Sequence, residues 1–459
     1  MANARDHITI ELKKMTTTNL TMSPQRCIFK VPNILKRHNP KAYAPNAFSI
    51  GPYHYGEEHL QATQKIKLMY LDDLITGFED PDTVLETLVG AMREVQQKAR
   101  DCYGDPFDHI SADEFVKILV LDGCFLIQLF RKTADEKLQK DDPVFTVSCM
   151  SQLLGHDLIL LENQIPWMVL ELLFDKISTK LEDSSVQSLS SLLQRYCECN
   201  GTIFGDIDAV VKSLVSWKHE SNKHILDMLR NSLVLSSSVT HERSHEMEAG
   251  ILFKLKMGLK SLFRKLICLE KCLPNKEDKS TGWQSMPSAA RLREAGIKFK
   301  SSTSPNSILD IKFEDGVLEI PPILIHEDTE SLFRNLICLE QCLPNCDTIV
   351  TSYAILLDNL INTTEDMEIL CKGRIFDNFL NTDDATELFN QLYDDAYVKE
   401  FHYTDLIKKV QKYCGRHWPR YRTVFIHEYL KHPWAICSIV VAAIFLILTV
   451  VQTVFTIIK

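Results

Sequence analysis

The sequence lacks the short motifs that mark the commonest catalytic sites. It contains no GxxxxGK[ST], GxGxxG or GxSxG pattern, so the usual phosphate-binding loops and the nucleophile turn of serine hydrolases are absent. Glycine is scarce, at 16 of 459 residues. The 14 cysteines form no CxxC pair, and no histidine lies close in sequence to the cysteines at 338, 342 and 346. We therefore expect free thiols, and we predict neither a metal nor another cofactor.

Positive charge is also in deficit. Lys and Arg total 51 against 61 for Asp and Glu, which gives a formal net charge of −10. A nucleic-acid-binding protein needs a basic surface to contact phosphates, so nucleic acid is not expected as a partner. Hydrophobic residues at 45% and charged residues at 24% are ordinary for a globular chain with a large core.

One long hydrophobic run is present at the end of the chain. No charged residue occurs from Trp434 through Phe445 to Ile458, a stretch of 25 residues. A helix of that length spans roughly 37 Å, against about 30 Å for the hydrocarbon core of a bilayer. The run predicts a transmembrane helix at residues 434–458 rather than a buried core helix.

The flanks of this run set the expected orientation. Lys459 is the one basic residue that follows the run. The basic residues that precede it are Lys408, Lys409, Lys412, Arg416, Arg420, Arg422 and Lys431. Excess Lys and Arg remain on the cytoplasmic side, and the N-terminus has no apolar core of signal-peptide length. The pattern predicts a single-pass protein with a cytosolic body, in a membrane that it does not identify. On the opposite topology, the sequons at Asn200 and Asn362 would be glycosylation sites.

The rest of the chain predicts a mainly α fold with a small β element. Asp80-Pro81 and Ser111-Ala112-Asp113-Glu114 are helix starts, each followed by apolar residues at helical spacing. Glu314-Asp315-Gly316 separates two β-type runs and predicts a hairpin. We expect a disordered tail at 1–24, a large helical body at 25–430 and the membrane anchor at 434–458.

A duplicated segment interrupts this body. Residues 261–275 and 331–345 agree at 13 of 15 positions, and the first copy lies in the expected linker at 237–283. The same linker holds HERSH at 241–245, which matches the HExxH zinc pattern in polar surroundings where no amphipathic helix is expected. We assign no function to either feature.

Three carboxylates in apolar surroundings are the candidate site residues: Asp122, Asp157 and Glu162. A buried carboxylate needs a hydrogen-bonding partner or a raised pKa. As a functional hypothesis, the three would serve a hydrolase. As a structural hypothesis, they would cap helix ends and accept hydrogen bonds from the backbone. The second is favoured because no base, nucleophile or metal partner is evident. We expect neither a catalytic residue nor a small-molecule substrate.

Six segments in a fixed order resemble one plant family, the one called domain of unknown function 247. They are VPNILKRHNPKAYAPNAFSIGPYHYG, VLDGCFLIQLFRK, DLILLENQIPW, REAGIKFK with SILDIKFEDGVLEIP, NLICLEQC with VTSYAILLDNLINTTEDMEIL, and HPWAICSIVVAAIFLILTVVQT. The resemblance implies a mostly helical, membrane-associated plant protein without an established catalytic activity. Some grass members are linked to pollen–stigma self-incompatibility, which points to recognition. Gln64 and Gln128 stand where the family usually has Glu, which weakens any catalytic role at these positions.

From these observations we expect a membrane-anchored recognition or scaffold protein that acts through contacts with an unidentified protein partner. The alternative is a membrane-tethered hydrolase that uses the buried carboxylates.

Overall fold

The computed structural model describes residues 8–9, 11–13, 24–179, 188–199, 222–234, 285–303, 307–378, 380–398, 400–415, 441, 445 and 448–449. These residues divide into two compact units. Unit 1 is drawn from Met1–Ile203, Leu214–Asn231 and Ser331–Asp347, and unit 2 from Phe204–Ser213, Ser232–Glu330 and Thr348–Lys459. Each unit is considered by itself.

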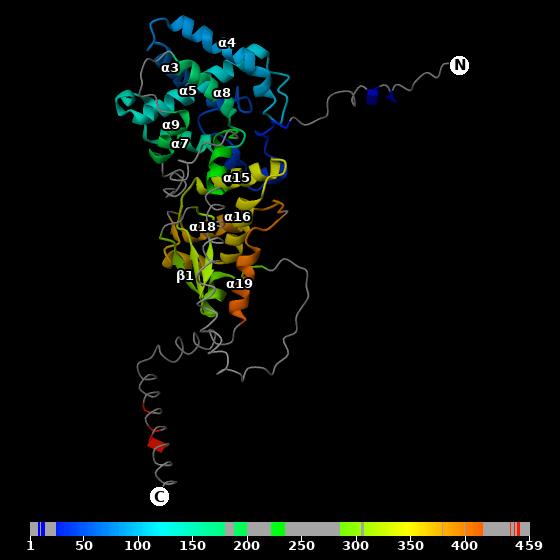
Figure 1. Cartoon of the computed structure of the whole chain (residues 1–459), viewed down its shortest axis with the longest axis vertical. Helices are drawn as coiled ribbons and strands as arrows, with labels where there is room; N and C mark the ends of the chain where they lie inside the picture. The colour runs from blue at the N-terminus through cyan, green and yellow to red at the C-terminus, as the bar shows by residue number, and fades with distance from the viewer. Residues whose placement is uncertain are drawn as a thin grey trace, which may run out of the picture. The chain divides into compact units, whose positions relative to one another are not determined.

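Unit 1 is a helical bundle built around α5 (Ala112–Ala134), which contacts α3, α4, α8 and α9 (Figure 1). From Phe115 to Phe130, Lys117 is the one exposed side chain of α5. A helix that is apolar nearly all round must lie inside the body. The other elements of unit 1 are α2 (Asn33–Lys36), η1 (Pro40–Tyr43), η2 (Glu58–Thr63), α3 (Gln64–Ile75), α4 (Pro81–Arg100), η3 (Glu136–Gln139), α6 (Pro143–Thr146), α7 (Ser148–Leu158), α8 (Trp167–Ser178), α9 (Leu189–Cys199) and most of α15 (Thr329–Cys342).

The helix starts predicted from sequence are confirmed. Asp80 caps α4 by accepting a hydrogen bond from the Thr83 amide, and Pro81 occupies the first helical position. The Ser111 hydroxyl accepts from the Glu114 amide at the start of α5. Side-chain oxygens at these positions satisfy amides that have no partner within the helix.

Unit 2 combines short helices with two small sheets. The first sheet has the order β1-β3-β2, with β1 (Lys298–Ser301) parallel and β2 (Lys312–Glu314) antiparallel to β3 (Val317–Ile320). The second pairs β4 (Ile323–Ile325) with β5 (Phe376–Asn378) in parallel. The helices are α14 (Ala289–Glu294), α16 (Ile349–Leu360), α17 (Thr364–Lys372), α18 (Thr382–Gln391) and α19 (Thr404–Cys414).

The predicted hairpin is the β2–β3 pair. Asp315 and Gly316 both have positive φ, at 47° and 79°, as a two-residue turn of this type requires. Gly316 is also needed for space, because a Cβ there would overlap the Tyr413 ring of α19. The mainly helical fold with a small sheet element is therefore confirmed.

The predicted transmembrane helix is not supported. Within the part of the chain that the structure describes, no helix is both long and apolar enough to cross a bilayer. The two longest described helices, α4 and α5, carry charged residues along their length, such as Arg93 in α4 and Lys117 in α5. The predictions of a transmembrane segment and of a single-pass membrane localisation are therefore corrected. Of residues 434–458, the structure describes Val441, Phe445, Leu448 and Thr449; the others, with Trp434 and Ile458, lie outside the described residues.

Other predicted segments also fall largely outside the described residues. They are most of the tail at 1–24, the linker at 237–283, and the basic residues Arg416, Arg420, Arg422 and Lys431. The remaining basic residues, Lys408, Lys409 and Lys412, lie exposed on α19, whose buried side chains include Ile407 and Val410. Lys408 pairs with Asp405 at 3.2 Å on the same helix. Because the transmembrane helix is not supported, we interpret these three lysines as part of the polar face of an amphipathic helix.

Candidate functional site

The three candidate carboxylates of unit 1 all contact one irregular segment, residues 24–56. Its prolines and glycines prevent a continuous helix, so the backbone amides of Val31 and of residues 46–51 lack the regular partners of a helix or sheet. Several of these residues are nevertheless buried, including Phe48 and Ile50. Buried amides must be hydrogen-bonded, and side chains from other elements supply the acceptors.

Asp157, near the end of α7, accepts three of these bonds. Oδ1 lies 2.6 Å from the Asn46 amide nitrogen, and Oδ2 lies 2.9 Å and 2.7 Å from those of Ala47 and Phe48. Burial raises the pKa of Asp157 to about 6, although the three amides favour the ionised form. The carboxylate therefore supplies the hydrogen-bond acceptors that a neighbouring strand or a helical turn would otherwise provide to this short stretch of backbone.

Asp122 lies on α5 and forms a buried ion pair. Its Oδ1 is 2.5 Å from Lys67 Nζ of α3, and its Oδ2 accepts from the Gly51 amide at 2.8 Å. Lys67 also donates to the Ser49 carbonyl. Burial raises the pKa of Asp122, while Lys67 and the Gly51 amide oppose that shift. Gly51 has φ of +78° and its missing Cβ would meet the Gln164 carbonyl, so glycine is required where the backbone approaches Asp122.

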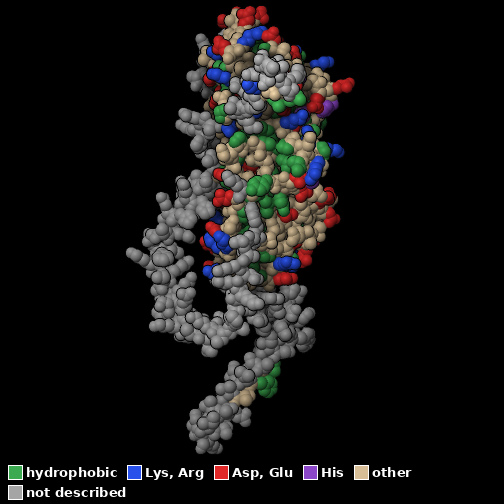
Figure 2. All heavy atoms as spheres, turned by 90° about the vertical axis from the view of Figure 1, so that its right-hand side faces the viewer, with side chains coloured by type: hydrophobic (Ala, Val, Ile, Leu, Met, Phe, Trp, Pro, Cys, Tyr) green, Lys and Arg blue, Asp and Glu red, His purple; other side chains and the backbone are tan. Residues whose placement is uncertain are grey.

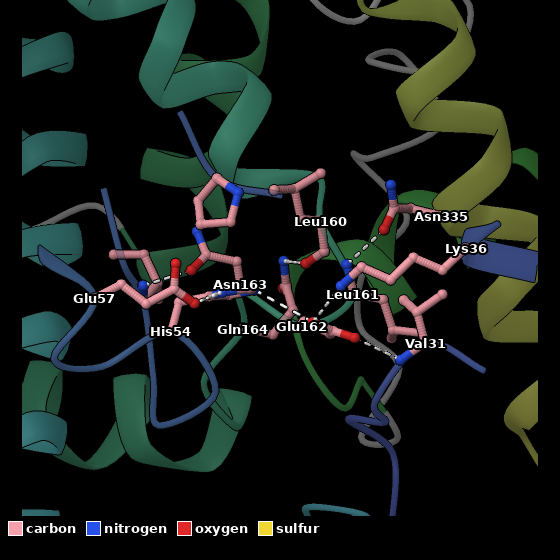
Figure 3. Close-up of polar contacts among 12 residues, drawn as sticks. Val31, Lys36, His54, Glu57, Leu160, Leu161, Glu162, Asn163, Gln164 and Asn335 are labelled. Atoms are coloured by element: carbon pink, nitrogen blue, oxygen red, sulfur yellow. Dashed lines mark hydrogen bonds and ion pairs between the residues drawn. The ribbon is translucent and has the colours of Figure 1, made fainter. Parts of the chain in front are cut away.

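Glu162 lies at the centre of a third cluster (Figure 3). Its Oε1 accepts from the Val31 amide at 2.7 Å, and its Oε2 lies 3.4 Å from both Lys36 Nζ and His54 Nε2. His54 Nδ1 is 2.7 Å from Glu57 Oε1, so this imidazole sits between two carboxylates. The Glu162 side chain is 4% exposed, whereas Glu57 is 42% exposed and reaches solvent.

Two amides beside Glu162 belong to the same arrangement. Asn163 accepts from the Ile50 amide at 2.7 Å and donates to the Phe48 carbonyl at 2.9 Å. Gln164 donates to the Leu158 and Leu160 carbonyls and accepts from the Leu226 amide. Sequence reasoning singled out Glu162 and missed these neighbours and Lys67. The available signal was a run of three polar residues enclosed by apolar residues in DLILLENQIPW.

Asn335 of α15 completes the cluster and distinguishes the two copies of the duplicated segment. Its Oδ1 accepts from the Leu161 amide at 2.9 Å, and its Nδ2 donates to the Ala42 carbonyl at 2.8 Å (Figure 3). The corresponding residue of the first copy is Lys265. Lysine has no acceptor, so the first copy could not replace the second in this position.

The geometry offers few elements of a catalytic centre. Among the described residues, no group of three His, Cys, Asp or Glu side chains is arranged to hold a metal ion. His54 is a candidate base beside Glu162, and within the described structure its Nε2 has no hydroxyl or thiol as a hydrogen-bonding partner. The structure thus brings each of the three carboxylates to the segment at 24–56, in separate clusters with separate amide donors.

The comparison with protein families matches this chain from residue 28 to residue 448 to a family described as plant protein of unknown function, DUF247. The chain belongs to this family. The match includes all three carboxylates and residues 28–56 of the segment that they contact, which confirms the resemblance seen in the sequence.

Two relatives from Arabidopsis thaliana extend this result. UPF0481 protein At3g47200 is 27% identical over 435 residues, covering 93% of this chain and 85% of the relative. Putative UPF0481 protein At3g02645 is 22% identical over 514 residues, covering 98% of this chain and 93% of the relative. No solved structure matches the chain. The family assignment therefore rests on nearly the whole chain, and it carries no assigned activity.

Proposed function

We propose that this protein is a recognition or scaffold protein, and that residues 24–56 form the surface that contacts its protein partner. The supporting observation is that each of the three candidate carboxylates accepts a hydrogen bond from at least one backbone amide of this segment. Buried acids committed to backbone amides are unsuited to acid–base chemistry, and they fix an irregular loop in one conformation. Loops held by a rigid scaffold are the usual place for binding residues.

The charge of the segment supports an acidic partner. Residues 24–56 contain five basic residues and no Asp or Glu, in a chain whose net charge is −10: Arg26, Lys30, Lys36, Arg37 and Lys41. Lys30, Arg37 and Lys41 are exposed, and Ile34 is 50% exposed beside them in sequence. A basic surface with an exposed aliphatic residue suits contact with an acidic protein surface, because complementary charge speeds association and selects partners.

One face of the described surface carries charges of both signs. Figure 2 shows Lys and Arg side chains interspersed with Asp and Glu on the face that it presents, the mixed pattern of an ordinary globular surface. The acid-free segment departs from this pattern.

The test is lysine-directed cross-linking of the full chain in plant cells, followed by affinity measurement with the partner that is recovered. We expect cross-links from Lys30 and Lys41, and weaker binding by a double variant, Arg37→Glu with Lys41→Glu. Two reversed charges should weaken binding by about tenfold or more, at roughly 1 kcal/mol each. The matched control is Lys372→Glu with Lys408→Glu, which reverses two exposed lysines in unit 2.

Equal binding by the two double variants, both folded, would contradict the proposal. The competing hypothesis of a hydrolase would need the buried carboxylates or His54 for turnover. It would gain support if a purified, metal-analysed sample hydrolysed a generic ester, and if Glu162→Gln or Asp122→Asn abolished that turnover without changing the thermal midpoint.

A further inference from the structure

Two cysteines far apart in the sequence lie side by side in unit 1. The Cys27 and Ile28 amides both donate to the Cys102 carbonyl, at 2.8 Å and 3.0 Å, and the Gly104 amide donates to the Ile28 carbonyl at 2.8 Å. These bonds form a parallel β-bridge between Ile28 and Tyr103. Cys27 and Cys102 each precede a bridge partner, so their side chains leave the same face of the pair.

This spacing fits a disulfide. Neighbouring strands lie about 4.7–4.9 Å apart, and disulfide-bonded residues have Cα atoms roughly 4.4–6.8 Å apart. In the structure both residues are thiols that share a hydrogen bond, and the Cys102 thiol also donates to the Lys98 carbonyl at 3.4 Å. The hydrogen bond between the two thiols raises the pKa of Cys27 and lowers the pKa of Cys102.

The backbone around the pair is held independently of the thiols. His224 Nε2 lies 3.0 Å from the Cys27 carbonyl oxygen, and its Nδ1 accepts from the Asp227 amide. Burial lowers the pKa of His224 to about 4, so the ring is neutral at physiological pH and donates through Nε2. The two cysteines are thus positioned before any bond forms between them.

A second thiol pair serves as an internal comparison. Cys338 and Cys342 also share a thiol hydrogen bond, but both lie on α15, one helical turn apart. Residues at this spacing on a helix have Cβ atoms about 5–6 Å apart, whereas a disulfide needs roughly 3.5–4.5 Å. Contact between thiols is therefore common to both pairs, and backbone geometry suited to a disulfide belongs to Cys27 and Cys102.

A cavity lies next to the pair. It has a volume of about 470 Å³, and its lining includes Arg26, Asp101 and Tyr103, the residues that flank the two cysteines in sequence, but neither cysteine itself. Cys102 is 7% exposed and Cys27 is 1% exposed. Of the two thiols, Cys102 is therefore the one that a small disulfide compound meets first.

We propose that Cys27 and Cys102 form a redox modification site that reacts with low-molecular-weight disulfides of the glutathione class. The Cys102 thiolate attacks one sulfur of glutathione disulfide and releases one glutathione thiolate, leaving a mixed disulfide on Cys102. The Cys27 thiolate then attacks the Cys102 sulfur and releases the second glutathione. Both cysteine protons end on the two glutathione thiols, and the protein gains one disulfide.

The experiment equilibrates the folded full-length protein with glutathione disulfide, alkylates the remaining thiols and maps the peptides by mass spectrometry. We expect the loss of two alkylatable thiols and one dominant cross-link, between Cys27 and Cys102, with the circular dichroism unchanged. Cys338 and Cys342 should remain alkylatable. Both cysteines remaining alkylatable, or cross-links spread evenly over the other cysteines, would overturn the proposal.

Two variants test the order of attack. Cys27→Ala should accumulate a glutathione adduct on Cys102, because the resolving thiol is missing, and Cys102→Ala should leave Cys27 unmodified. An adduct on Cys27 in the second variant, at the level seen on Cys102 in the first, would contradict the assigned nucleophile. The wild-type peptide map decides the existence of the site even if one of these variants fails to fold.

Discussion

Asp157 in unit 1 and Asp366 in unit 2 perform the same structural task in different electrostatic surroundings. Each accepts hydrogen bonds from several backbone amides that have no partner within a helix or sheet. Asp366 accepts from Ala290 at 2.7 Å and from Thr363 at 3.0 Å, and so joins the start of α14 to the start of α17. Burial raises the pKa of Asp157 to about 6, whereas at Asp366 the hydrogen bonds outweigh burial and lower the pKa.

The difference shows how a buried acid should be interpreted. Three strong amide donors do not determine the sign of a pKa shift, because the sign depends on the desolvation that they must offset. A raised pKa is often a reason to suspect catalysis. In unit 1 it accompanies acids that anchor a loop, so the hydrogen-bonding partners carry more information about the role than the pKa alone.

The largest effect should come from separating the buried ion pair. Asp122→Asn leaves the Lys67 ammonium buried without a counter-charge, so the free energy of unfolding should fall by about 3–5 kcal/mol in a denaturant titration. Adding Lys67→Met should recover part of that loss, because the unpaired charge is removed while the new side-chain amide oxygen at position 122 still accepts from the Gly51 amide. A double variant less stable than the single one would contradict the ion-pair account.

The pH dependence of Asp157 should be the next largest effect. Its ordinary pKa is 3.8, and in the folded protein it is about 6. The protonated form is favoured by folding, so the stability that it contributes is present below about pH 4 and is lost as the pH rises toward 6. The loss should reach about 3 kcal/mol at 1.36 kcal/mol per unit. The check is the stability of wild type minus Asp157→Asn across this range, and a flat difference would contradict the raised pKa.

Asp366 should show a smaller effect with the opposite dependence on pH. Asp366→Ala removes the N-terminal capping box of α17 and should lower stability by about 1–2 kcal/mol. Because its pKa is lowered in the folded state, this contribution is present above the ordinary value and is lost as the pH falls below it. A variant whose loss grew on acidification would show that the two sites do not differ as described.

The smallest effect should be at the surface. Arg93 and Asp113 lie 2.5 Å apart but are 57% and 75% exposed. Solvent screening leaves such pairs worth about 1 kcal/mol or less. A double-mutant cycle with Arg93→Ala and Asp113→Ala should therefore give a coupling well below that of Lys67 and Asp122, and equal couplings would remove burial as the explanation.

Local signals in the sequence predicted much of the fold. The caps at Asp80 and Ser111, the apolar surface of α5 and the Asp315-Gly316 turn depend on neighbouring residues, and all are confirmed. The burial of Asp122 also followed from its apolar neighbours, and it is 3% exposed. The pairing of Asp122 with Lys67, and of Glu162 with Val31, depends on contacts over 55 and 131 positions that no local pattern encodes.

The membrane prediction is wrong. It relied on hydropathy alone at residues 434–458, and no described helix meets the requirements for a span. The role of the site also required the tertiary structure, because only the hydrogen bonds to the amides of residues 31–51 distinguish anchoring acids from catalytic ones. The acid-free composition of residues 24–56 was visible in the sequence, but its meaning depended on which side chains are exposed.

The most direct test of the central claim is native-state hydrogen exchange at the Val31, Ala47, Phe48 and Gly51 amides. If the three carboxylates hold the segment rigidly, these amides should exchange almost as slowly as those in the middle of α5, and Asp157→Ala, which removes the acceptor oxygens, should release Ala47 and Phe48 while Val31 stays protected. Rapid exchange at all four amides in the wild type would show that the segment is not anchored, and would contradict the account of both the site and its proposed function.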